Sequence, residues 1–295
     1  MDSSLITIVN LKKPTRIFDY IVENSFLVLS SKSAVKKAFK KKEIHLNGKP
    51  SITGDWLKLG DEIEFIPNEI KQQKVFPLEL VVLFEDEFMA VINKPAGYSV
   101  SGNFHKTIQN ALSFNLKKSL LTDALSIPRP VHRLDKLTAG LLLIAKTKSA
   151  QINLGKQFED QVIFKTYYAL VKGKLEGEGV FDIPIDGLSA FTEYKSMKIQ
   201  KSLSYDFVTL VELKPKTGRT HQLRIHLAKF DFPIIGDYVH DTENVLKGKG
   251  LFLAACAIEF SHPNTTNLLS FTIPYPAKYE SLFERENRRW EKFNS

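Results

Sequence analysis

The sequence has few of the residues that build several common kinds of functional site. Of its 295 residues only one, Cys256, is a cysteine, so a disulfide within the chain is impossible and a cysteine-rich zinc site is excluded. Cys256 lies in the apolar run 251–258, where we expect it to be a small buried hydrophobic side chain. The sequence contains no phosphate-binding loop of the Walker type and no G-x-G-x-x-G. No cofactor motif is visible, and no cofactor is expected.

Long hydrophobic runs are also missing. No apolar span reaches the roughly 18 residues that suggest a membrane helix. Residues 1–5 are not a basic stretch that leads into an apolar core, so no secretion signal is predicted. Together with the single cysteine, these features predict a cytoplasmic protein that has no membrane partner.

Acidic residues are fewer than basic ones, 33 against 41, and the formal net charge is +8. A basic balance favours a polyanionic partner, and nucleic acid is the first to consider. The length predicts either one large domain with a smaller one or two modest domains.

Residues 14–67 have the pattern of a small α+β domain with two helices and a hairpin. Apolar residues at helical spacing predict helices over 16–22 and 33–42, with Ser33 as the N-cap of the second. An Asn-Gly pair between two short runs is a hairpin signal, and the alternation over 62–65 predicts a further strand. One face of the second helix is apolar. Its other face carries Lys36, Lys37, Lys40 and Lys41.

These four lysines have two interpretations. On a lone helix they would be a solubilising surface. Here the order of two helices and a hairpin resembles, over residues 15–66, the RNA-binding domain named after the fourth small-subunit ribosomal protein. That resemblance implies that the lysine face contacts RNA phosphates, independently of the RNA sequence.

Residues 68–78 are predicted to be a polar linker, and residues 79–295 a larger domain. Apolar or alternating runs predict strands over 80–84, 88–92, 141–146, 164–171, 205–213, 251–260 and 268–273. Helical patterns predict helices over 107–119, 149–160 and 220–230, the last capped by Thr220. The predicted fold class is therefore α+β: a mixed, mostly antiparallel sheet with flanking helices, plus the small N-terminal α+β domain.

The stretch with the most chemical information begins His132-Arg133-Leu134-Asp135. A carboxylate stands between an arginine and a turn-like Thr-Ala-Gly, and the apolar run 141–146 follows. Such a run is usually a buried strand, so we expect Asp135 on a loop anchored by rigid structure, where catalytic residues tend to lie. For an arbitrary Arg-x-Asp, a solvated pair near a turn would be the better interpretation.

The whole stretch 132–146 resembles the central motif of the RluA-type pseudouridine synthases. Further segments resemble other motifs of that family, in the family's order: 93–97, 165–173, 216–226, 236–238 and 261–263. The resemblance spans roughly 80–276. Two positions depart from the family pattern, since Ala139 replaces a serine and Ala254 replaces a histidine.

The resemblance implies that the protein isomerises uridine to pseudouridine in structured RNA. The glycosidic bond to nitrogen 1 is cut, the uracil turns, and a bond to carbon 5 forms, without redox chemistry or ATP. The resemblance makes Asp135 the essential carboxylate, Tyr167 the aromatic residue against the uracil, and Arg224 an ion-pair partner that lowers the pKa of Asp135. Asp135 could attack the sugar or the base, or remove a sugar proton, and the sequence leaves these alternatives open.

Further substrate contacts follow from the same resemblance. A stacked uridine must be flipped out to reach a carboxylate, and Arg133 is the residue expected to fill the vacated space. Leu223 would line an apolar pocket. His132, Leu134 and Lys165 are also expected to contact the substrate.

Two features of the segment 216–226 have alternative interpretations. Arg219 could pair with Asp135 instead of Arg224, because either guanidinium offers a rigid fork to a carboxylate. His221 and His226 invite a metal site, but ligands on one helix are usually three or four residues apart and no carboxylate or cysteine completes the set. No metal is therefore expected.

The expected partner is RNA, and a monomer is expected. The small domain favours ribosomal RNA over transfer RNA. A non-catalytic RNA-binding ribosome-assembly factor is the alternative, and the complete set of Asp135, Tyr167 and Arg224 argues against it. A hydrolase that uses Asp135 with His132 or His221 is supported by no nucleophile elbow and no paired carboxylates.

Overall fold

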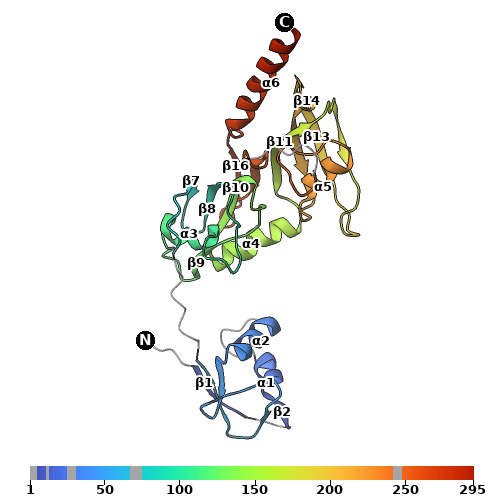
Figure 1. Ribbon diagram of the computed structural model, residues 1–295. Helices are drawn as coiled ribbons and strands as arrows, with labels where there is room; N and C mark the ends of the chain where they lie inside the picture. Colours follow the sequence, from blue (N-terminus) through green and yellow to red (C-terminus); the bar gives the residue numbers. More distant parts are fainter. Residues whose placement is uncertain (1–4, 11–12, 25–30, 67–74, 242–247) are drawn as a thin grey trace. The chain divides into compact units, whose positions relative to one another are not determined.

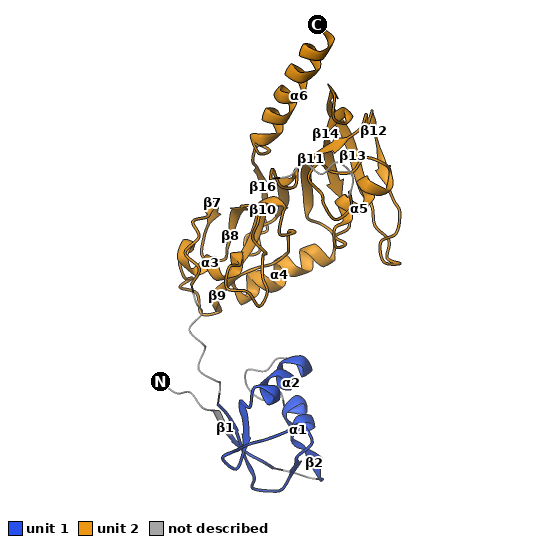
Figure 2. Ribbon diagram, viewed as in Figure 1, with its two compact units in different colours: residues 1–73 blue, residues 74–295 orange. Residues whose placement is uncertain are grey.

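The computed structural model describes residues 5–10, 13–24, 31–66, 75–241 and 248–295. The chain forms two compact units, residues 1–73 and 74–295 (Figure 2). The predicted linker, 68–78, falls mostly outside the described residues.

The first unit contains an antiparallel four-stranded sheet and two helices (Figure 1). The sheet order is β1 (Leu5–Ile8), β6 (Glu62–Phe65), β3 (Ile44–Leu46) and β4 (Lys49–Pro50). A separate ladder joins β2 (Thr15–Arg16) to β5 (Trp56–Leu57), and the helices are α1 (Ile17–Glu23) and α2 (Lys32–Lys40). The predicted helices, hairpin and strand are confirmed.

Helix α2 is amphipathic, as its spacing predicts. Val35, Ala38 and Phe39 are buried in the core of this unit, while the four lysines on the opposite face are exposed. The prediction of Ser33 as the N-cap was wrong. Ser31 is the N-cap, with an extended backbone and a hydroxyl that accepts the N–H of Ala34 at 3.2 Å, whereas Ser33 already lies in the first turn.

The second unit is built on one large sheet whose pairs are antiparallel except β10 with β15. A mixed, mostly antiparallel α+β fold is therefore confirmed. The strand order is β12 (Glu178–Phe181), β13 (Thr192–Ser202), β14 (Asp206–Pro215), β11 (Phe164–Lys172), β15 (Leu253–Ser261), β10 (Ala139–Thr147), β8 (Met89–Lys94) and β7 (Val81–Glu85), with β9 (Ala124–Pro130) on β10 and β16 (Leu268–Thr272) on β15. Its helices are α3 (Ile108–Asn115), α4 (Lys148–Glu159), α5 (Gln222–Lys229) and α6 (Lys278–Asn294).

Strand β10 is the most buried strand of this sheet. Every residue from Gly140 to Thr147 is buried, as the apolar run 141–146 predicts, because the strand has a hydrophobic cluster on each face. The strand therefore gives the loop before it a rigid end. No helix among the described residues is long and apolar enough to cross a membrane.

The predicted cap of α5 was also wrong. The helix begins at Gln222, and its N-cap is His221 in the left-handed conformation, with φ of 55°. The Gln222 side chain organises this end, since its Oε1 accepts the Thr217 hydroxyl at 2.7 Å and the Arg219 N–H at 3.0 Å. Thr220 makes no side-chain cap here, and the turn instead places His221 at the site described below.

Candidate active site

Asp135 lies on the loop between β9 and β10, as predicted. Leu134 is buried beside it in a hydrophobic cluster, and the N–H of Thr138 donates to the Asp135 carbonyl at 3.1 Å. The N–H of Gly97 donates to the Lys136 carbonyl at 2.7 Å. The backbone on both sides of Asp135 is thus held by packing and hydrogen bonds, while 20% of its side chain stays exposed.

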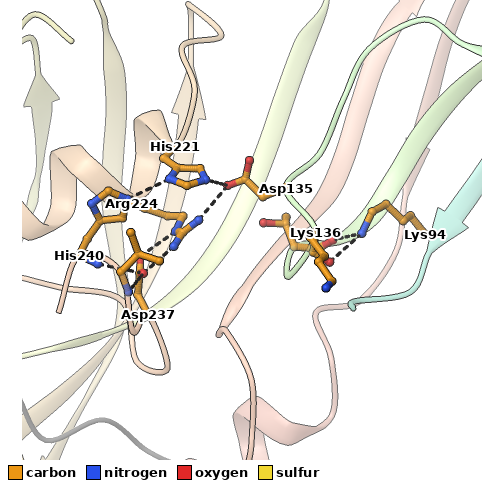
Figure 3. Close-up of polar contacts among 9 residues, drawn as sticks. Lys94, Asp135, Lys136, His221, Arg224, Asp237 and His240 are labelled. Atoms are coloured by element: carbon orange, nitrogen blue, oxygen red, sulfur yellow. Dashed lines mark hydrogen bonds and ion pairs between the residues drawn. The ribbon is translucent and has the colours of Figure 1, made fainter. Parts of the chain in front are cut away.

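Lys94, at the end of β8, is a further anchor of this loop. Its fully buried ammonium donates to the carbonyls of Thr138 at 2.7 Å, Pro95 at 3.0 Å and Lys136 at 3.4 Å (Figure 3). Burial lowers the pKa of Lys94 to about 8, and the charge of Asp135 opposes that shift. The resemblance of 93–97 to a family motif gave Lys94 no role, so this function was not predicted. The available signal was a lysine between a strand and a proline.

The start of β10 depends on Gly140. Its φ is 120°, and a Cβ there would lie 2.1 Å from the carbonyl oxygen of Ala255. Only glycine permits this close approach, which forms the parallel pairing of β10 with β15. The end of the Asp135 loop is therefore fixed against a central strand.

Arg224, on α5, is the cation beside Asp135. Its Nη1 lies 3.4 Å from Asp135 Oδ2, while Nε and Nη2 donate to the two Asp237 oxygens at 2.7 and 2.6 Å. Burial opposes the charges of this pair, but the hydrogen bonds and mutual attraction outweigh it, so the pKa of Arg224 is raised and that of Asp237 is lowered. Asp237 thus aims the guanidinium at Asp135. Arg219 instead donates to the Ser189 carbonyl at 3.0 Å.

Two histidines extend this cluster on the side of Arg224 (Figure 3). His221 Nε2 lies 3.8 Å from Asp135 Oδ2, and His221 Nδ1 lies 3.0 Å from His240 Nε2. Burial lowers the pKa of His240, and Arg224 and His221 act in the same direction against the carboxylates. Neither His240 nor Asp237 was predicted at this site. Asp237 lies in the segment 236–238, which resembles a family motif but was given no role, and His240 had no signal.

A cavity of about 450 Å³ opens beside Asp135. Its lining contains every site residue predicted for the second unit: His132, Arg133, Leu134, Asp135, Lys165, Tyr167, Leu223 and Arg224. Arg133 is exposed, whereas Leu223 is only 7% exposed. The predicted RNA-binding lysines, Lys36, Lys37 and Lys40 of α2 and Lys41 at its C-cap, belong to the first unit.

Tyr167 and His132 are two rings of this cavity whose protonation is fixed by burial. Burial, with Asp135 nearby, raises the pKa of the Tyr167 hydroxyl. Burial, with Lys165 nearby, lowers the pKa of His132 to about 3. His132 Nε2 accepts the N–H of Leu143 at 3.0 Å, and its ring lies on Phe158 with centroids 4.7 Å apart. His132 therefore fastens the loop to β10 through its ring nitrogen.

The described residues contain no cluster of three or more histidine, cysteine, aspartate or glutamate side chains placed to hold a metal ion. His221 faces Asp135, whereas His226 is directed elsewhere, with its Nδ1 3.1 Å from the Thr192 hydroxyl and its Nε2 3.1 Å from the Ile183 carbonyl. The two histidines thus take part in different polar networks.

Comparisons with known proteins place this chain in a class of RNA-modifying isomerases. A family model described as RNA pseudouridylate synthase matches residues 89–229. Ribosomal large subunit pseudouridine synthase D of Nitrosomonas europaea is 33% identical over 255 residues, which are 76% of this chain and 71% of that protein. This chain belongs to the RNA pseudouridylate synthase family.

Another relative and two solved structures are also described as pseudouridine or pseudouridylate synthases. Ribosomal large subunit pseudouridine synthase C of Escherichia coli strain K12 is 31% identical over 280 residues, 82% of this chain and 84% of that protein. The structures of human RNA pseudouridylate synthase domain containing 1 and 4 share this fold, each with a TM-score of 0.55. They are 22% and 24% identical, cover 70% of this chain, and match 86% and 92% of their own chains. The family model begins at residue 89, so the resemblance of the first unit to a ribosomal-protein domain stays a prediction.

Proposed function

We propose that this protein converts uridines of structured RNA, ribosomal RNA of the large subunit foremost, to pseudouridine, with Asp135 as the catalytic carboxylate. The family makes the protein an RNA pseudouridine synthase. The choice of RNA is supported by the two relatives described above, which are named for the large ribosomal subunit. Transfer RNA is the second substrate to test.

One observation carries the proposal for the site. A partly exposed carboxylate on a rigid loop faces a cavity that also contains an aromatic ring, an apolar leucine and a buried arginine. The volume of about 450 Å³ lies in the range of small-molecule sites, as a flipped nucleotide requires. The arginine is held from behind by Asp237, so it can stay near Asp135 throughout the reaction.

Asp135 is placed to act on the nucleotide once the base enters the cavity. The bond from the ribose to nitrogen 1 breaks, the uracil turns, and carbon 5 bonds to the ribose. Carbon 5 loses its proton and nitrogen 1 gains one, so the product is an isomer of the substrate. Asp135 can attack the sugar or the base, or remove a sugar proton, and the three routes share the requirement for an unprotonated carboxylate. Arg224, 3.4 Å away, supplies the matching charge.

Tyr167 and Leu223 form the apolar side of the proposed uracil site. Since burial raises the pKa of Tyr167, the ring is neutral at pH 7 and offers a stacking surface. The hydroxyl remains near Asp135, where it can guide the proton that leaves carbon 5. Lys165 and Leu134 complete the proposed contacts, and His132 contributes by holding the loop.

Arg133 is proposed to fill the space that the flipped uridine leaves in the RNA. It is exposed, adjoins Asp135 and lines the cavity, so it can enter the RNA from the side on which the base leaves. We expect Arg133→Ala to slow turnover on structured RNA. Full turnover by this variant would contradict the role.

The first unit is proposed to bind RNA phosphates through the exposed lysine face of α2. Lys36, Lys37, Lys40 and Lys41 lie opposite the buried face of this helix. Such contacts add affinity without reading the sequence of the RNA.

The substrate is tested with unmodified transcripts of bacterial large-subunit ribosomal RNA and of transfer RNA. Pseudouridine is mapped through its carbodiimide adduct after incubation with the protein. We expect product at defined uridines of the ribosomal transcript. Product in transfer RNA alone would contradict the choice of ribosomal RNA, and tight binding with no product in either would contradict the proposed reaction.

A further inference from the structure

A second cavity, of about 360 Å³, adjoins the first at Asp135. The two share Arg133, Leu134, Asp135, His221 and Arg224 in their linings. The rest of the second lining is different and includes Ser99, Ser101, Lys136, Tyr238 and Val239. Asp135 and Arg224 therefore form part of a shared wall.

Tyr238 is an aromatic side chain that lies outside the hydrophobic clusters of the second unit. It is 59% exposed, and its neighbour Val239 is 49% exposed. The turn that carries them is rigid, because the buried Asp237 accepts the N–H groups of Val239 at 3.1 Å and of His240 at 3.2 Å. The turn starts at Gly236, where a Cβ would meet the Gly250 carbonyl oxygen at 2.1 Å. The carboxylate that aims Arg224 thus also holds Tyr238 at the cavity.

The charges around the second cavity suit the backbone of an RNA strand. Arg133 and Lys136 are both exposed and both line it, and neither takes part in an ion pair among the described residues. Ser99 and Ser101 add hydroxyls that can pair with ribose hydroxyls or phosphate oxygens. An exposed aromatic ring beside cations is the combination that binds unpaired nucleotides, because bases stack on the ring and cations neutralise phosphates.

We propose that the second cavity binds the nucleotide next to the target uridine, with Tyr238 stacked on its base. This inference rests on the proposed function. A flipped uridine stays covalently joined to both neighbours, so the strand must continue from the first cavity past Asp135. The second cavity lies on that side of the shared wall, and its occupant would position the ribose of the target against Asp135. Tyr238 is then a determinant of which uridines are modified.

The test is a cycle of protein and RNA changes. The RNA is a stem–loop copied from the uridine that the native protein modifies in the ribosomal transcript, made with either the 5′ or the 3′ neighbouring base removed. Single-turnover rates at subsaturating protein are compared for native protein, Tyr238→Ala and Tyr238→Phe. Phe293→Ala is the matched control, because Phe293 is another exposed aromatic residue, 75% exposed, outside both cavities.

One base removal is expected to slow the native protein and Phe293→Ala by about tenfold, the scale of one lost stacking contact. Tyr238→Ala should be about tenfold slower on intact RNA and lose nothing further on that abasic RNA, while Tyr238→Phe should behave as native. The inference would be overturned if the losses caused by Tyr238→Ala and by base removal multiplied at both neighbouring positions. It would also be overturned if base removal caused no loss at either position. Failure of the proposed function is separate, since native protein would then form no pseudouridine in the intact stem–loop.

Discussion

Burial keeps two rings in the first cavity neutral, although it shifts their pKa values in opposite directions. Burial raises the pKa of the Tyr167 hydroxyl and lowers the pKa of His132 to about 3. The cavity thus combines two uncharged rings with the cation that lies beside Asp135, Arg224. Arg224 therefore supplies the charge beside Asp135, and the two rings supply packing surface.

Tyr167→Phe should retain at least about ten times more turnover than Tyr167→Ala. The phenylalanine keeps the ring that stacks on uracil, and the loss of such stacking slows reactions by roughly tenfold or more. Single-turnover formation of pseudouridine in the modified stem–loop measures this. Equal losses in the two variants would show that the hydroxyl, rather than the ring, makes the main contribution.

His132 should make the second unit lose stability as the pH falls. In the unfolded chain His132 titrates near its ordinary pKa of 6.5, whereas in the fold its pKa is about 3. Between these values the unfolded state binds more protons, so the free energy of unfolding decreases as the pH falls, by about 2 kcal/mol from pH 7 to pH 5. His132→Gln removes this contribution.

The measurement is urea unfolding at pH 7 and pH 5, followed by tryptophan fluorescence. In a Trp56→Phe background, Trp290 of the second unit is the single tryptophan. His132→Gln should show the smaller decrease between the two pH values. The same decrease with and without His132 would contradict a buried neutral imidazole.

At the scale of elements, the loop between β9 and β10 is held from three sides. Lys94 binds its carbonyls, His132 ties it to Leu143 of β10, and Gly140 lets β10 approach β15. The hydrogen bonds of Lys94 span more than 40 residues, as its separations from Lys136 and Thr138 are 42 and 44. The position of Asp135 therefore depends on β8 as well as on its own strand.

Lys94→Met should both destabilise the second unit and slow turnover. Three carbonyls lose their donor, at a cost of about 1–3 kcal/mol for each that stays unsatisfied, and the loop loses its anchor. Lys278→Met is the matched control. Lys278 is another lysine whose pKa burial lowers to about 8, and it donates to the Leu251 and Lys249 carbonyls away from Asp135.

Thermal unfolding and single-turnover rates distinguish the two variants. Both should lower the unfolding temperature, but only Lys94→Met should slow the reaction by more than about tenfold, since a displacement of about 1 Å can cost that much or more. Equal rates in the two variants would contradict a positioning role for Lys94.

Elements with strong apolar periodicity could be predicted, and elements defined by their neighbours could not. The run 141–146 identified β10 because both faces of that strand are buried. Strands β9, β12 and β13 of the large sheet were missed. Six of the eleven residues of β13 are lysine, serine or glutamine, and its place is set by the ladder to β14 instead of by an apolar run of its own. Its polar side chains gave no strand signal.

The same distinction applies to the site. Asp135, Tyr167 and Arg224 could be found because their motifs are local and resemble a known family. Asp237 pairs with Arg224, 13 residues away along the chain, and His240 lies against His221, 19 residues away. These contacts come from tertiary packing, and their separations match no helix or strand period. The hydrogen bonds of Lys94 to carbonyls likewise have no counterpart in the sequence, because the acceptors are backbone atoms.

At the scale of the whole molecule, positive charge is a property that the two units have in common. The chain has a formal net charge of +8, and each unit presents exposed cations, on α2 in the first and at Arg133 and Lys136 in the second. A polyanion can bind such surfaces through counterion release, which makes affinity depend on salt.

Neutralising Lys36, Lys37, Lys40 and Lys41 to glutamine should weaken RNA binding and flatten its salt dependence. Each phosphate contact that is lost reduces the slope of log affinity against log salt by about 0.7 to 0.9. Lys49→Gln with Lys58→Gln is the control, because both are exposed lysines of the same unit outside α2. Filter binding of the ribosomal transcript over a salt series measures the slopes. An unchanged slope in the α2 variant would contradict the proposed phosphate contacts.

The most direct test of the account is the single-turnover rate of Asp135→Asn on the stem–loop that the native protein modifies, measured beside its affinity for that RNA. Asparagine keeps the shape of the side chain and removes the carboxylate. Asp160→Asn is the control, since Asp160 is exposed at the end of α4 and does not line either cavity. We predict no detectable pseudouridine with Asp135→Asn, binding within a few-fold of native, and native turnover with Asp160→Asn. Turnover by Asp135→Asn within about tenfold of native would contradict the central claim that Asp135 is the catalytic carboxylate.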